Sequence, residues 1–151
     1  MADTIELEYT SNAGDNYYLE IVTFLDDEFP RRIIGEATLE RSILGMNYSS
    51  GPSVKHKNLW VINTLVRNEV TTRATKNGTA FNELQLLKQL YDAWDTDRAN
   101  ALQAKVEVND RVLGGGVTYS SFGWFTEPPA YSLAGNYGSG YINAVFSLTE
   151  V

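Results

Sequence analysis

The chain has 151 residues, of which 43% are hydrophobic and 21% are charged, as in an ordinary globular domain and unlike a disordered chain. Its formal net charge is -7, with 12 Lys plus Arg against 19 Asp plus Glu, so we expect no surface that binds nucleic acid or an anionic membrane tightly. It contains no cysteine, which excludes disulfides, cysteine nucleophiles and zinc–thiolate sites.

The sequence predicts a single domain over residues 1–151. The acidic segment Met1–Thr10 has no apolar stretch and is not a signal peptide. A membrane-spanning helix needs about 20 consecutive apolar residues, and no such run occurs. We therefore expect a protein that is made and folded in a cytosol.

The first 25 residues predict a β-hairpin. Ile5, Leu7 and Tyr9 alternate with polar residues, which is the period of a half-buried strand. Asn12–Asp15 contains a glycine and predicts a turn, and Tyr17–Leu25 is rich in aromatic and β-branched residues, as in a second strand.

The following segment is less regular. Asp26–Glu28 predicts an acidic loop, whereas Ile33–Gly45 fits either a helix or a strand followed by a turn. Ser49–Ser53 (SSGPS) predicts a loop. Leu59–Leu65 predicts a central strand, because apolar residues occupy both of its faces.

One amphipathic helix is predicted in the middle of the chain. The polar segment Arg67–Thr79 contains the turn signal Asn77–Gly78. Apolar residues spaced by three and four then predict a helix over Phe81–Trp94, with Thr79 as its N-cap and Asp95–Asp97 at its end. A helix of roughly 14 residues is marginal alone, so it should dock on a sheet. The residues expected on its apolar face are Phe81, Leu84, Leu87, Leu90, Tyr91 and Trp94.

The last third predicts further strands. Ala104–Val108 alternates like a strand, and Asn109–Asp110 predicts a turn after it. Gly114–Gly116 is typical of a hairpin tip or a bulge, and Tyr141–Val151 alternates as a closing strand. The predicted fold class is α+β and β-dominant: an antiparallel β-barrel or sandwich flanked by one amphipathic helix.

No group of residues in this sequence predicts catalysis, a metal or a cofactor. His56 is the only histidine, and alone it supplies neither a metal site nor the base for a serine nucleophile. Asp26–Glu28 and the group Asp92, Asp95 and Asp97 are sequence neighbours, which a loop and a helix end explain. Gly114–Gly116 lacks the Lys and the Ser or Thr of a phosphate-binding loop. We expect a protein that is not an enzyme, with no catalytic, cofactor or metal residues.

Aromatic residues are concentrated in a Gly-rich, Pro-interrupted region near the C-terminus. They fit a binding face, including one on which sugars stack, and they fit equally a role in completing the core. These residues are Trp124, Phe125, Tyr131, Tyr137 and Tyr141.

Three segments in order resemble the small tail structural proteins of tailed bacteriophages, of the tube, tube-initiator and distal-tail or baseplate ring types, which also occur in contractile injection systems. They are the helix FNELQLLKQLYDAW (Phe81–Trp94), the element FTEPP (Phe125–Pro129) and the strand YINAVFSLTEV (Tyr141–Val151). The resemblance covers Leu59–Val151. It leaves Met1–Asn58 unmatched beyond the hairpin.

The resemblance implies a tail-tube-like domain that forms a homohexameric ring in a virion tail assembled in the host cytoplasm. Neighbouring tail or baseplate proteins would be its partners, and the tape-measure protein and the genome DNA would pass through without tight binding. Independently of the resemblance, Asn109–Phe122 and Ser132–Gly140 are rich in Gly and Ser, so we expect them, with Arg67–Thr79 as a third candidate, to be mobile arms that join the subunits. Two other functions stay open: a non-catalytic carbohydrate-binding β-module, and a small acid–base enzyme whose carboxylates would have to converge.

Overall fold

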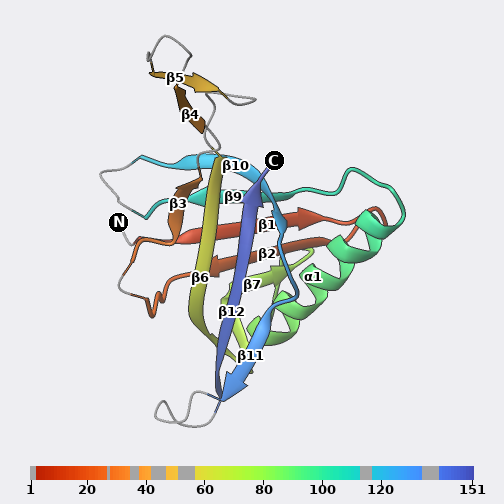
Figure 1. Ribbon diagram of the computed structural model, residues 1–151. Helices are drawn as coiled ribbons and strands as arrows, with labels where there is room; N and C mark the ends of the chain where they lie inside the picture. Colours follow the sequence, from red (N-terminus) through yellow and green to blue (C-terminus); the bar gives the residue numbers. More distant parts are fainter. Residues whose placement is uncertain are drawn as a thin grey trace.

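The computed structural model describes residues 3–26, 28–34, 38–41, 47–50, 57–112, 117–133 and 140–151. These residues form a ten-stranded antiparallel sheet, a separate two-stranded sheet and one helix, α1 (Glu83–Ala99) (Figure 1). The strands are β1 (Ile5–Thr10), β2 (Asn16–Ile21), β3 (Arg31–Ile34), β4 (Thr38–Arg41), β5 (Asn47–Ser50), β6 (Lys57–Arg67), β7 (Val70–Lys76), β8 (Thr79–Asn82), β9 (Val106–Asp110), β10 (Tyr119–Phe125), β11 (Ala130–Leu133) and β12 (Tyr141–Glu150).

The large sheet folds over on itself at β12. Its strand order is β3-β6-β12-β10-β9-β1-β2-β7-β8, and β11 also pairs with β12. The first half of β12 lies beside β11 and its last residues lie beside β10, while β6 pairs along almost its whole length. Figure 1 shows β6 and β12 crossing β1, β2 and β9 steeply, so that two layers enclose the core. This architecture confirms the predicted β-dominant α+β fold flanked by one helix.

The core lies between these layers and is built by alternation along each strand. Buried residues alternate with more exposed ones along β1, β6, β9 and the middle of β12, because successive side chains of a strand point to opposite faces. The strands predicted over Leu59–Leu65 and Tyr141–Val151 are confirmed as β6 and β12. The largest fully buried side chains on these four strands are Trp60, Phe146, Ile5, Leu7, Ile62, Leu148, Val106 and Val108.

Helix α1 packs on the sheet as predicted, but its bounds differ from those expected. Thr79 is not the N-cap, because Asn77 and Gly78 adopt φ values of 53° and 79° and turn the chain back, so that Thr79–Asn82 pairs with β7 as β8. Asn82 caps the helix instead, accepting a 3.1 Å hydrogen bond from the Gln85 backbone N–H. The helix also continues through Asp95–Asp97 to Ala99.

The apolar stripe of α1 is largely as predicted. Phe81 precedes the helix in β8, and both Phe81 and Tyr91 are only partly buried against the core. Leu86, which the predicted stripe omitted, is completely buried. The buried apolar side chains of the helix are Leu84, Leu86, Leu87, Leu90 and Trp94.

The predicted N-terminal hairpin is confirmed, with a shorter second strand. β1 and β2 pair from Ile5 with Ile21 to Thr10 with Asn16. Tyr17–Leu25 was expected to be one strand, but β2 ends at Ile21. The Leu25 N–H instead donates a 2.8 Å hydrogen bond to the Asn63 carbonyl of β6.

Two predicted turns or loops are strands. Asn109 and Asp110 do not form a turn, because they pair with β1 on one side and β10 on the other. Ser49 and Ser50 of the predicted loop belong to β5, and residues 51–53 lie outside the described part of the chain. The polar composition of both segments suggested a turn or a loop, but the backbone N–H and C=O groups of polar residues can form strand hydrogen bonds as well as those of apolar residues.

Arg67–Thr79 was wrongly expected to be a mobile arm. Most of it is β7, an interior strand hydrogen-bonded to β2 and to β8. The described ends of the other two proposed arms are also paired: Tyr119–Phe122 in β10 and Ser132–Leu133 in β11. Residues 113–116, with the predicted glycine tip, and residues 134–139 lie outside the described part.

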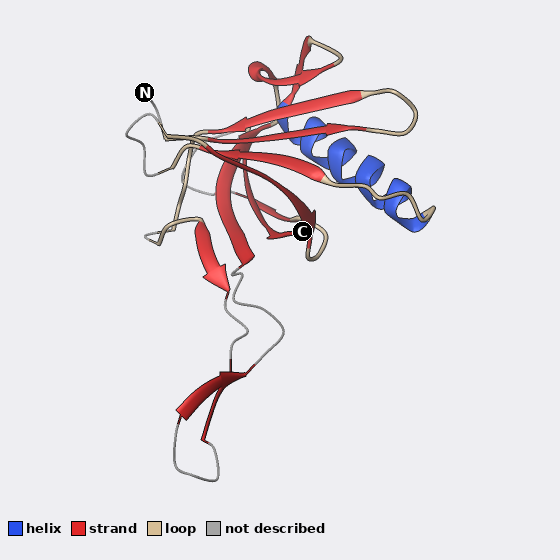
Figure 2. Ribbon diagram, turned by 90° about the horizontal axis from the view of Figure 1, so that it is seen from above, coloured by secondary structure: helices blue, strands red, loops and turns tan. Residues whose placement is uncertain are grey.

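The ambiguous segment Ile33–Gly45 contains strands in its described residues. β4 and β5 pair only with each other, from Thr38 with Ser50 to Arg41 with Asn47. Figures 1 and 2 show this hairpin standing away from the main body. Its two neighbours along the chain, β3 and β6, pair with each other at its base, where Ile34 lies opposite Lys57.

Candidate functional site

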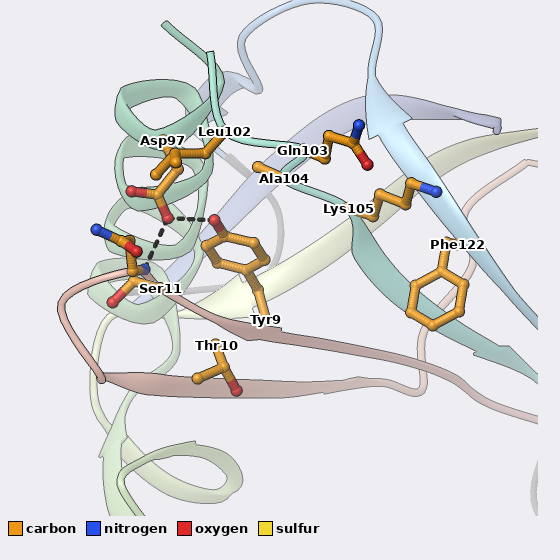
Figure 3. Close-up of a pocket in the computed structure, with 10 residues that line it drawn as sticks. Tyr9, Thr10, Ser11, Asp97, Leu102, Gln103, Ala104, Lys105 and Phe122 are labelled. Atoms are coloured by element: carbon orange, nitrogen blue, oxygen red, sulfur yellow. Dashed lines mark hydrogen bonds between the residues drawn. The ribbon is translucent and has the colours of Figure 1, made fainter. Parts of the chain in front are cut away.

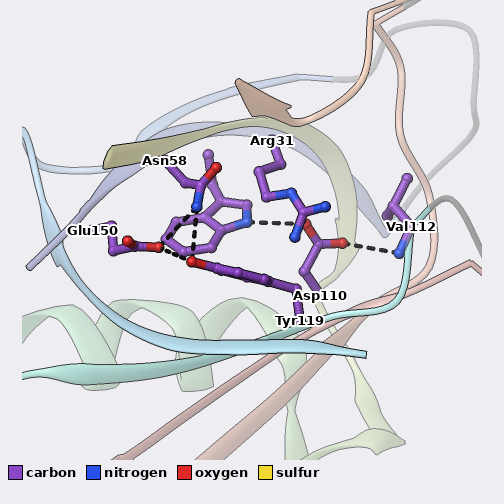
Figure 4. A network of polar contacts seen from close by, with 7 residues as sticks. Arg31, Asn58, Asp110, Val112, Tyr119 and Glu150 are labelled. Atoms are coloured by element: carbon purple, nitrogen blue, oxygen red, sulfur yellow. Dashed lines mark hydrogen bonds and ion pairs between the residues drawn. The ribbon is translucent and has the colours of Figure 1, made fainter. Parts of the chain in front are cut away.

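A network of polar and aromatic side chains lies where β3 and β6 leave the main body toward the hairpin, and we call it the root network (Figure 4). At its centre, the Trp60 indole Nε1–H donates a 3.1 Å hydrogen bond to the Asp110 carboxylate. Arg31 Nε lies 3.6 Å from the same carboxylate oxygen. Because Asp110 is almost fully buried, these contacts and a 2.9 Å bond from the Val112 N–H to its other oxygen balance a charge that burial alone would destabilise.

The second half of the root network joins β6, β10 and β12. The Tyr119 hydroxyl donates a 2.6 Å hydrogen bond to Glu150 Oε2, and Asn58 Nδ2 donates to both of these groups at 2.9 Å. The bond to Glu150, followed by burial, raises the pKa of Tyr119. The Arg31 guanidinium lies 4.5 Å above the Tyr119 ring, which links both halves.

The root network therefore ties five strands together at the base of the hairpin. Its members are Arg31 from β3, Asn58 and Trp60 from β6, Asp110 from β9, Tyr119 from β10 and Glu150 from β12. Such a fixed base can transmit force from the hairpin to the main body, but its side chains include no nucleophile next to a free base.

The outer face of β1, β2 and β9 carries four glutamates, and the register opposes them in like-charged pairs. Glu6 lies opposite Glu20, and Glu8 lies opposite Glu107. Directly opposed like charges destabilise a sheet. Arg111 forms an ion pair with Glu6, and Asn16 Nδ2 donates a 3.1 Å hydrogen bond to Glu8. This face would repel a polyanion that approaches it.

A hollow of about 380 Å³ lies between the end of α1 and the β1–β2 turn (Figure 3). The Tyr9 hydroxyl donates a hydrogen bond to Asp97 Oδ2, and the Asn12 N–H donates a second at 2.9 Å. Burial first, and then the carboxylate, raises the pKa of Tyr9. The opposite side of the hollow is formed by Gln103, Lys105 and the partly exposed ring of Phe122.

The aromatic residues singled out in the sequence are divided between core and surface. Phe125 is buried and packs edge-on against Tyr91 and Trp94, at centroid distances of 5.2 and 5.3 Å. Trp124 next to it is 44% exposed. Tyr131 and Tyr141 are partly buried, and Tyr137 lies outside the described residues.

Trp124 borders a second hollow of about 350 Å³ between α1 and the segment that follows β10. Trp94 and Phe125 contribute to its wall, and Arg98, Thr126 and Glu127 supply polar groups. A third hollow, of about 270 Å³, shares Tyr91 and Pro128 with it and also includes Tyr131. The Tyr131 hydroxyl is buried and has no hydrogen-bond partner within the described residues.

The acidic groups noted in the sequence do not form one cluster among the described residues, although Asp92 and Asp97 line a common hollow of about 420 Å³ with Asp15 and Lys76. Asp26 accepts a 3.1 Å hydrogen bond from Asn63, Glu28 pairs with Arg32 at 2.9 Å, and Asp27 lies outside the described part. Asp95 pairs with Arg98, whereas Asp97 faces Tyr9.

The remaining sequence candidates add no chemical site to this picture. His56 and Gly114–Gly116 lie outside the described residues. Among the residues that are described, no group of three or more His, Asp or Glu side chains is placed to hold a metal ion. No described helix is long and apolar enough to cross a membrane.

Sequence reasoning missed the root network and the opposed glutamates. The alternation of Ile5, Leu7 and Tyr9 with Glu6 and Glu8 did signal an acidic strand face. Which carboxylates oppose each other depends on strand register, and no local signal revealed the link from Trp60 to Asp110.

Comparison with protein-family models and with curated protein sequences found no match for this chain.

Proposed function

We propose that the protein is a structural subunit that forms a ring in a phage-type tail, as a tube, tube-initiator or baseplate adaptor. The observation that carries this proposal is the β4–β5 hairpin, which forms a sheet of its own beside the main body (Figure 2). A two-stranded hairpin is marginally stable in water without a packed face. A neighbouring subunit is the partner that would supply this face.

The root network supports a mechanical role for the hairpin. It anchors β3 and β6, the strands on both sides of the hairpin, to three further strands of the sheet. An arm that binds a neighbour can hold a ring together only if its base is fixed to its own subunit. The same contact repeated by rotation closes into a ring.

The opposed glutamates support a channel-facing role for the outer face of β1, β2 and β9. Like charges directly opposite each other weaken a sheet, and Arg111 and Asn16 compensate only Glu6 and Glu8 among the described contacts, so a function other than folding explains the four glutamates better. A wall of carboxylates lets a polyanion such as DNA pass without being held. The proposed partners are therefore further copies of this chain, neighbouring tail proteins, and the DNA and tape-measure protein in the channel.

The register at the base of the hairpin allows a direct test. Because Ile34 lies opposite Lys57, residues 35–56 can be replaced by Asn-Gly, the preferred pair for a two-residue hairpin turn. We expect the complete chain to form rings at high concentration, visible by negative-stain microscopy and by light scattering after gel filtration. The shortened chain should keep a cooperative thermal unfolding transition and remain monomeric.

Arg32→Ala is the matched control, because Arg32 lies in β3 and, among the described residues, its side chain pairs only with the exposed Glu28. This variant should form rings like the wild type. A wild-type chain that stays monomeric at high concentration, or rings that form without residues 35–56, would contradict the proposal.

A further inference from the structure

The outer face of β10 presents two aromatic side chains to solvent. Phe122 is 48% exposed and Trp124 is 44% exposed, whereas Gly123 and Phe125 between and beside them are buried. Residues two apart on a strand lie about 7 Å from each other on the same face. Exposed aromatic rings arranged in this way are typical of binding surfaces.

Each ring borders a hollow whose floor is formed by buried aromatic side chains. Phe122 lies at the edge of the hollow that contains Tyr9, and Trp124 lies at the edge of the hollow that contains Trp94 and Phe125. Tyr9, Trp94 and Phe125 are all at least nine-tenths buried. The Phe122 and Trp124 rings and the two hollows therefore lie next to a well-packed part of the core.

The polar groups around the two hollows are mixed in charge. Asp97, Gln103 and Lys105 line the first hollow, and Arg98, Thr126 and Glu127 line the second. The two hydrogen bonds that described residues donate to the Asp97 side chain both end on Oδ2, and none of them reaches Oδ1, which we take as an acceptor for a ligand. Each hollow thus offers donors and acceptors together with one acidic and one basic side chain.

This chemistry favours a neutral ligand with many hydroxyl groups. A sugar ring stacks its apolar face on an aromatic side chain, and its hydroxyls bond to carboxylates, amides and cations at the edge. An anionic ligand is disfavoured, because Glu107 lies directly opposite Phe122 in the sheet and Glu127 lines the second hollow. A purely apolar partner would remove water from polar side chains at the edges of these hollows, such as Gln103, Lys105 and Glu127, without replacing its hydrogen bonds.

We propose that the outer face of β10 binds a neutral oligosaccharide, with one sugar ring stacked on Trp124 and another on Phe122. The bound chain would extend from the hollow at Asp97 to the hollow at Glu127. This inference shares only Glu107 with the observations that support ring formation, and sugar binding can be measured independently of ring formation.

Calorimetric titration of the full chain with cellohexaose, maltohexaose and chitohexaose tests whether the outer face of β10 binds an oligosaccharide. At least one of these probes should bind. Trp124→Ala and Phe122→Ala should each weaken binding by roughly 3- to 10-fold, which corresponds to the loss of one aromatic contact. Leu133→Ala is the control, because Leu133 is 86% exposed on β11 and belongs to neither hollow.

Three results would overturn the inference. One is no binding of any of the three hexasaccharides at millimolar concentration, and another is binding that both aromatic substitutions leave unchanged. The third is a loss of self-association in Trp124→Ala without sugar binding in the wild type, which would assign this face to contact with a second copy of the chain.

Discussion

At the scale of single residues, three buried acidic side chains connect elements that are distant in sequence. Asp97 links α1 to β1, and Asp110 links β9 to β6. Glu83, in the first turn of α1, accepts hydrogen bonds of 2.8 Å from the Arg67 N–H and 2.9 Å from the Thr71 hydroxyl. A buried carboxylate without such donors would cost several kcal/mol, so each one fixes the position of its partners.

Tyr9→Phe should reduce the free energy of unfolding by about 1.5–3 kcal/mol, because it removes one of two hydrogen bonds to the charged and buried Asp97. Urea denaturation at neutral pH measures this change. A double-mutant cycle of Tyr9→Phe with Asp97→Asn should give a favourable coupling energy between the Tyr9 hydroxyl and the Asp97 carboxylate.

Tyr17→Phe serves as the control for this hydroxyl. Tyr17 is also buried, and its hydroxyl has no hydrogen bond to any described residue. Equal losses of stability in Tyr9→Phe and Tyr17→Phe would show that the bond from Tyr9 to Asp97 contributes nothing specific.

At the scale of elements, the decisive packing is that of α1 on the folded sheet. The helix contacts β2, β7 and β8 at one end of the strand order and β6 near the other. It therefore closes the open side of the layers, and the aromatic cluster of Tyr91, Trp94 and Phe125 fills the gap beside β10. Helical periodicity alone identified the docking face but not the partners.

Leu87→Asp should destabilise the fold by several kcal/mol, because Leu87 is completely buried and the new carboxylate would have no hydrogen-bond partner. Thermal unfolding followed by circular dichroism should show a clearly lower midpoint. Gln85→Asp introduces the same group at an exposed position of the helix and should change stability by less than about 0.5 kcal/mol. An unchanged midpoint in Leu87→Asp would mean that α1 does not pack as described.

At the scale of the whole molecule, buried tyrosines make stability depend on pH in the alkaline range. Burial, followed by the nearby Glu6, raises the pKa of Tyr18 to about 12. Burial is also the largest cause of the raised pKa values of Tyr9 and Tyr131, with Asp97 and Asp92 as the neighbouring charges. In the unfolded chain, each of these hydroxyls should titrate near pH 10.

Because the folded-state pKa values are the higher ones, the tyrosines contribute fully to stability below about pH 10 and lose this contribution as the pH rises toward 12. The denaturation midpoint should therefore be constant from about pH 8 to 9.5 and fall steeply above pH 10. Tyrosinate absorbance recorded in parallel should rise together with unfolding. A midpoint that stays constant to pH 11.5 would show that these hydroxyls titrate freely in the folded protein.

The sequence by itself determined the local structure wherever one strong physical signal acts alone. Alternation along Ile5–Tyr9, Leu59–Leu65 and Tyr141–Val151 identified strands and their buried faces, because burial of one face dominates a half-buried strand. Spacing by three and four identified α1, and the absence of cysteine excluded whole classes of site.

Only the tertiary structure decided the features on which the proposed functions depend. Strand register opposed Glu6 to Glu20, and the fold of the sheet brought Trp60 to Asp110. The outer face of β10 likewise lies near the end of α1 in the folded protein, although the two are separated along the chain. These contacts join residues that are far apart along the chain. The free energy that stabilises them comes from burial of the apolar residues around them, so no local sequence pattern predicts them.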